Sequence, residues 1–421
     1  MGATPFIAAL AAALACAGAA AADNASAELR LRWDARSDNA AGPLTDANAL
    51  APGTAATTPS AAVTEAELKH TLRAAGTPWS LAGNLLLMHE RPEGGPATSS
   101  ARVNELYGSA DFGAWQASAG KKIVGWDVGY AFRPNDFVQQ QERRTLLSLT
   151  PEGRPLLQLE HFGADSATSL VWVNPERLNE ADDAQRGARE SALAARWYGR
   201  SGALDGHLFG RVGQHTGGSL GAAAAWVATD ELELHASARV LQRHDGWSLD
   251  PAAGNALLRA NPWRQATLGG TAQWLLGASW TGALQQSVLV EAWRDGTALS
   301  DAGWDAWSTR NAALTSIAAQ PALRLPAAGN LAWQASPFTA DNLRRDNLFV
   351  RLAWQPEHWQ LSLDALLTPQ DRGRILTAAV QWQGDRLRLN AAWRVYGGAA
   401  DSLFARLPQR RAGVLSASWA F

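Results

Sequence analysis

Short segments of alternating polarity recur along almost the whole of this 421-residue chain, and they constrain the fold more than any other feature. In DRLRLNAAWRVYGG, apolar side chains occupy every second position from Leu387 to Val395. Arg386, Arg388 and Arg394 fall on the other set of positions. A helix would spread these arginines around its surface, whereas successive side chains of a strand point to opposite faces. The segment is therefore predicted to be a strand with one apolar and one charged face.

The same pattern recurs in HWQLSLDALLTP, DELELHASARVLQ, NLFVRLAWQ and AELRLRWDA. Short turns such as QPEH, QGDR and ATDEL alternate with long polar stretches, for example the run at 295–328. Short turns on one rim and long loops on the other are typical of membrane barrels. The chain is thus predicted to be all-β, a transmembrane antiparallel up-and-down β-barrel of about 16–18 strands. The count depends on weak segments near 143–174 and 305–336.

A soluble β-sandwich also alternates, so the composition of the two faces has to decide between the folds. Here the apolar face is rich in Ala, Gly and Trp and poor in Ile and Val, which is unusual for a packed core. The chain has 20 Trp against 4 Tyr and 10 Phe. Tryptophan suits positions where one edge meets water and the other meets lipid. A lipid-facing outer surface around a watery lumen explains both faces.

The N-terminal run PFIAALAAALACAGAAAADNASA is too short and alanine-rich to span a membrane. We interpret residues 1–22 as a signal peptide cut near Ala22, with a lipoprotein cut at Cys16 as an alternative. Cleavage near Ala22 would remove the single cysteine of the chain. Residues 23–421 are then one outer-membrane barrel domain. Within it, residues 36–63 are low in bulky side chains and are predicted to be a flexible loop or linker.

The last segment, RAGVLSASWAF, alternates up to a final aromatic residue. It resembles the C-terminal strand signature of bacterial outer-membrane barrels. The resemblance implies that Trp419 and Phe421 form a signal read by the barrel assembly machinery. It also implies that the last strand pairs with the first, which closes the sheet and removes its unpaired edges. AELRLRWDA is expected to be that first strand.

A second segment, GKKIVGWDVGYAFRPNDF at Gly120–Phe137, is similar to a segment of alginate-export-like and porin-like barrels. The shared features are basic residues after a glycine, then Trp126, then a Pro-x-Asp triplet ending at Asp136. Members of these families are passive or selective channels, and some export polysaccharide. The resemblance implies that this segment folds inward or lies at the rim of a pore and influences its conductance.

Closure places arginines of the first strand near those of the 386–396 strand, on either side of the terminal strand. The small inward residues of that terminal strand, such as Ser416 and Ser418, would not shield one set from the other. A basic wall is therefore predicted, with a modest preference for anions that salt would screen. Glu28 and Asp34 are potential partners that weaken it. The candidate pore-lining residues are Arg30, Arg32, Lys121, Lys122, Arg386, Arg388 and Arg394.

Catalytic and metal-binding patterns are weak. GGSLG spells a G-x-S-x-G motif around Ser219, but the residues that follow are predicted to form strand, turn and strand rather than the helix of a nucleophile elbow. The eight histidines form no metal-ligand spacing, and the net charge of −2 does not favour nucleic acid. No catalytic residue, metal or cofactor is predicted.

The sequence therefore predicts a non-enzymatic channel in the outer membrane of a bacterium. Its partners would be outer-membrane lipid, the barrel assembly machinery and an unknown small solute or polysaccharide that passes across the membrane. The alternative is a structural or surface-binding barrel that does not conduct. An outer-membrane hydrolase is less favoured.

Overall fold

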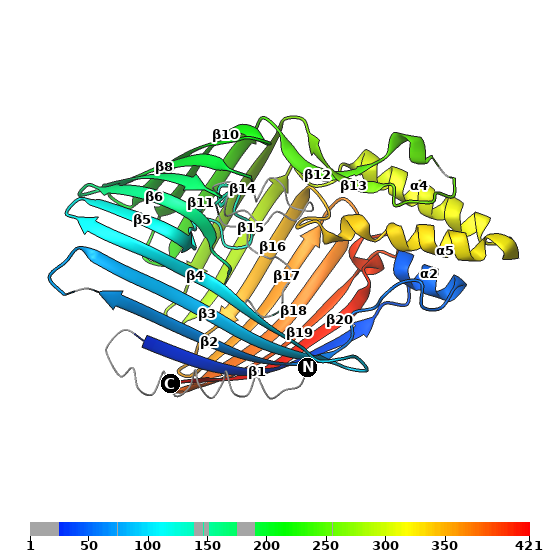
Figure 1. The fold of residues 1–421 in the computed structure, drawn as a ribbon, viewed down its shortest axis with the longest axis horizontal. Coiled ribbons are helices and arrows are strands. Elements are labelled where there is room, and N and C mark those ends of the chain that lie inside the picture. Colours follow the sequence, from blue (N-terminus) through cyan, green and yellow to red (C-terminus); the bar gives the residue numbers. More distant parts are fainter. Residues whose placement is uncertain (1–24, 74, 139–145, 147–150, 175–189, 255) are drawn as a thin grey trace.

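The computed structural model describes residues 25–73, 75–138, 146, 151–174, 190–254 and 256–421. Eighteen antiparallel strands form one closed barrel (Figure 1). They are β1 (Ala25–Asp38), β2 (Ala61–Arg73), β3 (Trp79–Pro92), β4 (Thr98–Phe112), β5 (Trp115–Lys122), β6 (Arg154–Phe162), β7 (Ser166–Val173), β8 (Ala192–Ser201), β9 (Leu204–Gly213), β10 (Gly217–Val227), β11 (Leu232–Leu241), β14 (Thr271–Thr281), β15 (Gln286–Asp295), β16 (Asp346–Trp354), β17 (Trp359–Thr368), β18 (Gly373–Gln383), β19 (Leu387–Gly398) and β20 (Gln409–Ala420).

Each barrel strand pairs with the next along the chain, and β11 pairs with β14 across a hairpin of β12 (His244–Leu249) and β13 (Trp263–Leu268). The barrel closes between the first and last strands, where Trp33 lies opposite Leu415. The backbone N–H of Phe421 donates to the carbonyl of Ala27 at 2.9 Å and extends this seam. The predicted fold class and the pairing of the first strand with the last are therefore confirmed.

Burial alternates along the strands as expected for a barrel in lipid. On β7, Ser169 and Val171 are buried toward the lumen, whereas Leu170 and Trp172 are 52% and 43% exposed on the outer face. Turns of two to five residues join the strands at one rim, and the longer loops lie at the other. Exposed tryptophans gather on the outer face near the rim of short turns: Trp79, Trp115, Trp226, Trp354, Trp359 and Trp419. Such a band is typical of a membrane interface.

The loop rim also carries helices, which the sequence analysis did not predict. Of the two weak segments, 143–174 contains β6 and β7, but a strand within 305–336 is wrong. That stretch forms α4 (Asp301–Ile317), the turn η4 (Pro321–Leu323) and α5 (Arg324–Trp333). The buried residues of α4 are three or four positions apart over its first turns, a helical spacing that a search for strands overlooks.

The segment at 36–63 contains the end of β1, helix α2 (Pro43–Leu50) and the start of β2. Ala47 of α2 packs with Leu314 and Leu331 of the longer helices in a small core outside the barrel. Composition did not show this helix because its partners lie more than 250 residues further along the chain. Short turns η3 (Pro251–Ala253), η5 (Ser336–Thr339) and η6 (Phe404–Arg406) complete the loop rim. No helix among the described residues is long and apolar enough to cross a membrane.

Candidate functional site

The residues after β5 turn into the barrel and pack against its inner wall. Trp126 and Val138 join a buried cluster with Val171, Ala194 and Phe209, which are lumen-facing residues of β7, β8 and β9. We call residues 123–138 the inward loop. Because it occupies part of the lumen, it narrows any passage through the barrel.

Further along, the inward loop reaches strands β14 and β15. The ring of Phe132 stacks on that of Trp293 with centroids 5.6 Å apart, and both rings pack with Leu275. Gly129 permits this turn, because a Cβ atom added there would lie 2.0 Å from the carbonyl oxygen of Phe132. The loop thus contacts the wall from β7 around to β15.

The buried carboxylate of Glu291 on β15 is the main anchor of the inward loop. It accepts hydrogen bonds from the backbone N–H groups of Tyr130 and Ala131 at 2.7 and 2.6 Å. His235 lies 2.9 Å from the same carboxylate through Nε2. Glu291 has no exposed surface, so these contacts replace the water that a carboxylate would otherwise require.

Two aspartates inside the inward loop fix its shape. Asp136 accepts from the backbone N–H groups of Trp126 and Asp127 at 2.6 and 2.9 Å. Asp127 accepts from the N–H of Asn135 at 2.6 Å and from the hydroxyl of Ser237 on β11 at 2.9 Å. The loop is therefore ordered by internal hydrogen bonds as well as by its contacts with the wall.

The wall formed by β16–β20 and β1–β2 carries charged side chains, and its residues Phe349 and Leu366 pack against the cluster of Phe132 and Trp293. Arg351 pairs with Asp364 at 3.2 Å, and Arg394 donates to the hydroxyl of Thr377 at 2.9 Å. We call this the charged wall.

The two arginines of the first strand, Arg30 and Arg32, belong to the charged wall, and both are paired. Glu65 of β2 lies 3.2 Å from Arg30 and 2.9 Å from Arg32. Glu28 contacts Arg30 at 2.9 Å, and Asp34 contacts Arg32 at 3.0 Å. Glu28 and Asp34 are the partners that the sequence predicts, whereas Glu65 is an additional partner. The alternating pattern of β2 could have revealed Glu65, because it places this residue on the same face as Arg30 and Arg32.

The arginines of β19 lie across the small inward residues of β20. Ser418 pairs in register with both Arg30 and Arg388, so these two arginines are level. Arg388 donates to the amide oxygen of Gln383 at 3.0 Å. Arg386 is exposed in the turn before β19, where its carbonyl accepts from the N–H of Ala420. The predicted basic wall therefore contains only one pair of arginines at the same level across β20, Arg30 and Arg388, because Arg386 lies in the turn.

The two lysines occupy the end of β5, where the inward loop begins. Lys121 forms an ion pair with Glu152. Lys122 donates to Gln158 at 2.9 Å and lies over the ring of Tyr107 at 5.2 Å. At the opposite rim, Trp419 and Phe421 are exposed on the outer side of the closing seam.

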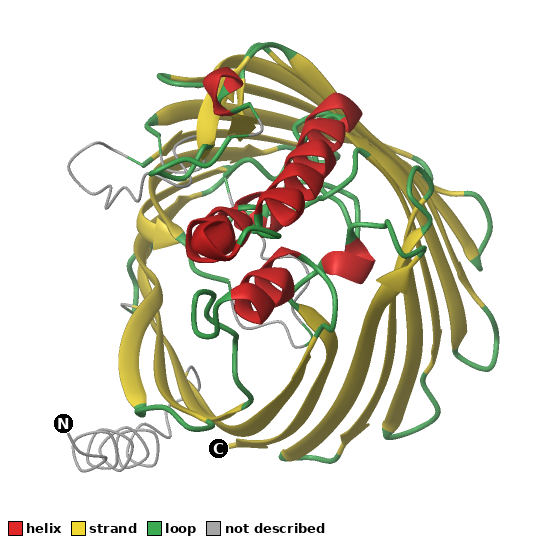
Figure 2. Ribbon diagram, turned by 90° about the vertical axis from the view of Figure 1, so that its right-hand side faces the viewer, coloured by secondary structure: helices red, strands yellow, loops and turns green. Residues whose placement is uncertain are grey.

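A cap of helices and loops extends across the loop-side opening of the barrel (Figure 2). Asp371, between β17 and β18, joins several of its parts. The carboxylate accepts from the hydroxyl of Thr368 at 2.6 Å, from the N–H of Leu403 at 3.0 Å and from Arg344 at 3.1 Å. Burial by itself raises the pKa of Asp371, but these hydrogen bonds and the charge of Arg344 outweigh it and hold the pKa below the ordinary 3.8.

We expect the cap to loosen in acid. A carboxyl group whose pKa is lowered by folding stabilises the structure above its ordinary pKa, and this stabilisation is lost as the pH falls through the lower, folded value. Hydrogen exchange of the loop around Leu403 should therefore accelerate below about pH 4. Asp371→Asn should show faster exchange already at neutral pH, whereas the exposed Asp401→Asn should not. Equal protection in Asp371→Asn and the wild type would contradict this role.

Ser219 lies within β10 rather than at a strand-to-helix turn, and it accepts a hydrogen bond from Arg239 at 3.0 Å. The chain continues into β11. The strand-turn-strand prediction is therefore confirmed, and the geometry of a nucleophile elbow does not occur here.

Comparison with known proteins gives matches in structure alone. No family model matches the sequence, and no curated protein matches it. Among solved structures, the barrel is similar to Pseudomonas aeruginosa OccK11 (OpdR), with a TM-score of 0.56 and 9% identity over 94% of this chain and 95% of that one. The chain folds as a porin-like β-barrel. A second porin-like match is Pseudomonas aeruginosa OccK5 (OpdH), with a TM-score of 0.54 and 11% identity. This match covers 94% of the present chain and 97% of the OccK5 chain.

Proposed function

We propose that this porin-like barrel is a channel in a bacterial outer membrane through which small hydrophilic solutes pass without chemical change. The observation that carries the proposal is the inward loop, which is anchored inside a closed barrel beside the charged wall. A barrel with only a structural role gains nothing from an ordered loop that partly fills a polar lumen. The structural neighbours, whose fold this chain shares, support the same reading.

The inward loop and the cap favour small solutes over a polymer, because each narrows the route through the barrel. We propose the paired residues of the charged wall, together with Lys122, as the lining that sets ion preference. Lys121 pairs in register with the exposed Leu106 and therefore lies on the outward face of β5. The negative charge of Glu65 compensates part of the positive charge of Arg30 and Arg32. Arg388 is bound by the neutral amide of Gln383, so its positive charge is not compensated there. The expected result is a weak preference for anions.

Single-channel recording of the purified protein in a planar bilayer tests this proposal. We expect discrete, ohmic current steps in dilute salt and a small reversal potential of anionic sign in a salt gradient. The matched control is the same detergent preparation after heat denaturation, which should give no steps. A folded barrel that inserts into the bilayer without conducting would overturn the proposal and favour a structural role.

A further inference from the structure

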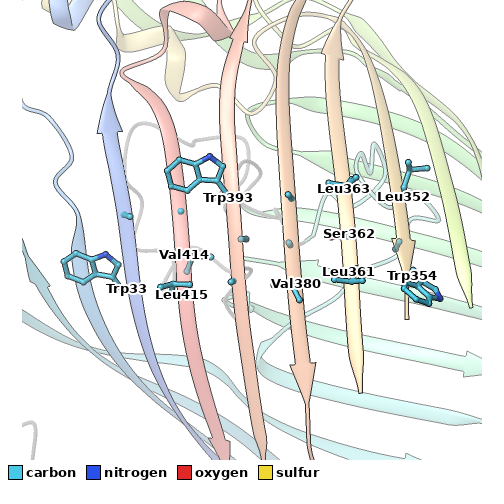
Figure 3. A pocket seen from close by; sticks show the side chains of 17 residues that line it. Trp33, Leu352, Trp354, Leu361, Ser362, Leu363, Val380, Trp393, Val414 and Leu415 are labelled. Carbon is cyan, nitrogen blue, oxygen red and sulfur yellow. The ribbon is translucent and has the colours of Figure 1, made fainter. Parts of the chain in front are cut away.

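The outer face of the barrel has a hollow of about 850 Å³ on β16–β20 and β1 (Figure 3). Trp33 on β1 and Trp354 on β16 stand at opposite sides of the hollow, and Trp393 on β19 stands between them; the three side chains are 43%, 48% and 47% exposed. Its floor contains the small residues Ala35, Ala378, Ala391 and Gly413. The hollow is therefore an apolar depression within the lipid-facing surface.

Two arginines point outward on the loop side of this hollow. Arg411 pairs in register with Val395, and Arg374 pairs with Gly397. Val395 and Gly397 lie two and four positions after Trp393 and so share its outward face. Both arginines are exposed, and no acceptor or carboxylate in the described part of the chain bonds to either side chain. The space outside Gly397, between the two arginines, is open.

Nearby carboxylates are engaged elsewhere. Asp371 is bound to Arg344 at 3.1 Å, and Asp346 pairs with Arg294 at 2.7 Å. An unpaired guanidinium at the edge of the apolar band loses hydration without gaining a partner. An anionic group supplied by the membrane would provide one.

The charged and apolar parts of this surface follow one another along the strands. Gly413 is two residues beyond Arg411, and Ala378 is four residues beyond Arg374, so the hollow begins about 7 Å from Arg411 and about 13 Å from Arg374 along the strands. We propose that this surface binds a phosphate-bearing lipid of the loop-side leaflet. Its phosphate lies between Arg374 and Arg411, and its acyl chains fill the hollow. This inference depends on the barrel spanning a membrane and does not depend on conduction.

A second copy of the chain fits the surface less well. All copies share one orientation in a membrane, so the rim arginines of two copies would meet at the same depth with like charge. A lipid instead presents a negative head group and apolar chains in the same order as the arginines and the hollow.

Native mass spectrometry of the full-length barrel tests the proposal with bis-phosphorylated lipid A as the probe. The wild type should retain one lipid, and Arg374→Gln/Arg411→Gln should bind it about tenfold or more weakly. The matched control is Arg91→Gln. Arg91 is also an exposed outward arginine near the loop rim, since it shares the partner Ala62 with Trp33, but it does not line the hollow. Its binding should equal that of the wild type.

A second variant tests the hollow separately from the charge. Ala391→Leu fills the floor and keeps both arginines, and it should also weaken lipid A binding. Equal binding by all variants would overturn the proposal, as would complete displacement of lipid A by an equal concentration of inorganic phosphate. Disulfide cross-linking of two copies through Trp33→Cys in the membrane would show that protein covers the hollow. Wild-type conductance in the arginine variant, together with lost lipid binding, would separate this site from the channel function.

Discussion

Replacing Glu291 by alanine is expected to widen the passage and raise single-channel conductance. The substitution removes the acceptor for the N–H groups of Tyr130 and Ala131 at the middle of the inward loop. Hydrogen bonds to a charged group contribute roughly 1.5–3 kcal/mol each, so the loop loses at least about 3 kcal/mol of anchoring. Part of the population should then open, and the recordings should show larger or noisier current steps than those of the wild type.

The control for this experiment is Glu233→Gln. Glu233 is on β11, 3.6 Å from His235, but it makes no bond to the inward loop. This variant removes a carboxylate from the same region and should conduct like the wild type. A second loop variant, Trp126→Ala/Phe132→Ala, removes apolar contacts instead of the anchor and should also raise conductance. Wild-type conductance in both loop variants, with the barrel still folded, would show that the loop does not limit the current.

Neutralising Glu65 should shift ion selectivity toward anions. Glu65 is 2% exposed and pairs with both Arg30 and Arg32, so Glu65→Gln leaves two guanidinium groups with less compensation in the charged wall. Their field raises the local concentration of anions. In a tenfold salt gradient the reversal potential should move by roughly 10 mV, well within the ~59 mV limit for perfect selectivity. The shift should shrink in 1 M salt, where the Debye length falls to about 3 Å.

The opposite change serves as the matched control for Glu65→Gln. Arg30→Gln/Arg32→Gln keeps the carboxylate and removes the cations, so its reversal potential should move toward cation preference. Arg388→Gln should move the potential in the same direction by a smaller amount. A reversal potential that is the same in Glu65→Gln and in the double arginine variant would place these side chains outside the ion path.

Local pattern determined most of the barrel. Alternation is a property of each strand by itself, so the sequence separates the outward face of β19, with Trp393, from the inward face, with Arg388 and Arg394. The same rule places Arg30 and Arg32 in the lumen. Because sheet edges cannot face lipid, a chain of such strands has to close. The pairing of the first strand with the last followed from that requirement.

Only the tertiary structure decided which charges meet. Tyr130 and Glu291 are 161 residues apart in the chain, and Arg30 and Glu65 are 35 apart. Such contacts depend on strand register and on the path of a loop through the lumen, and neither leaves a local period in the sequence. The helices of the cap were not predicted for a related reason. Ala47 of α2 is buried by Leu314 of α4 and Leu331 of α5, which are distant in the sequence. The two faces of a strand can be identified from the residues of that strand alone. The contact partners of a side chain on another strand or loop are fixed only when the barrel has folded.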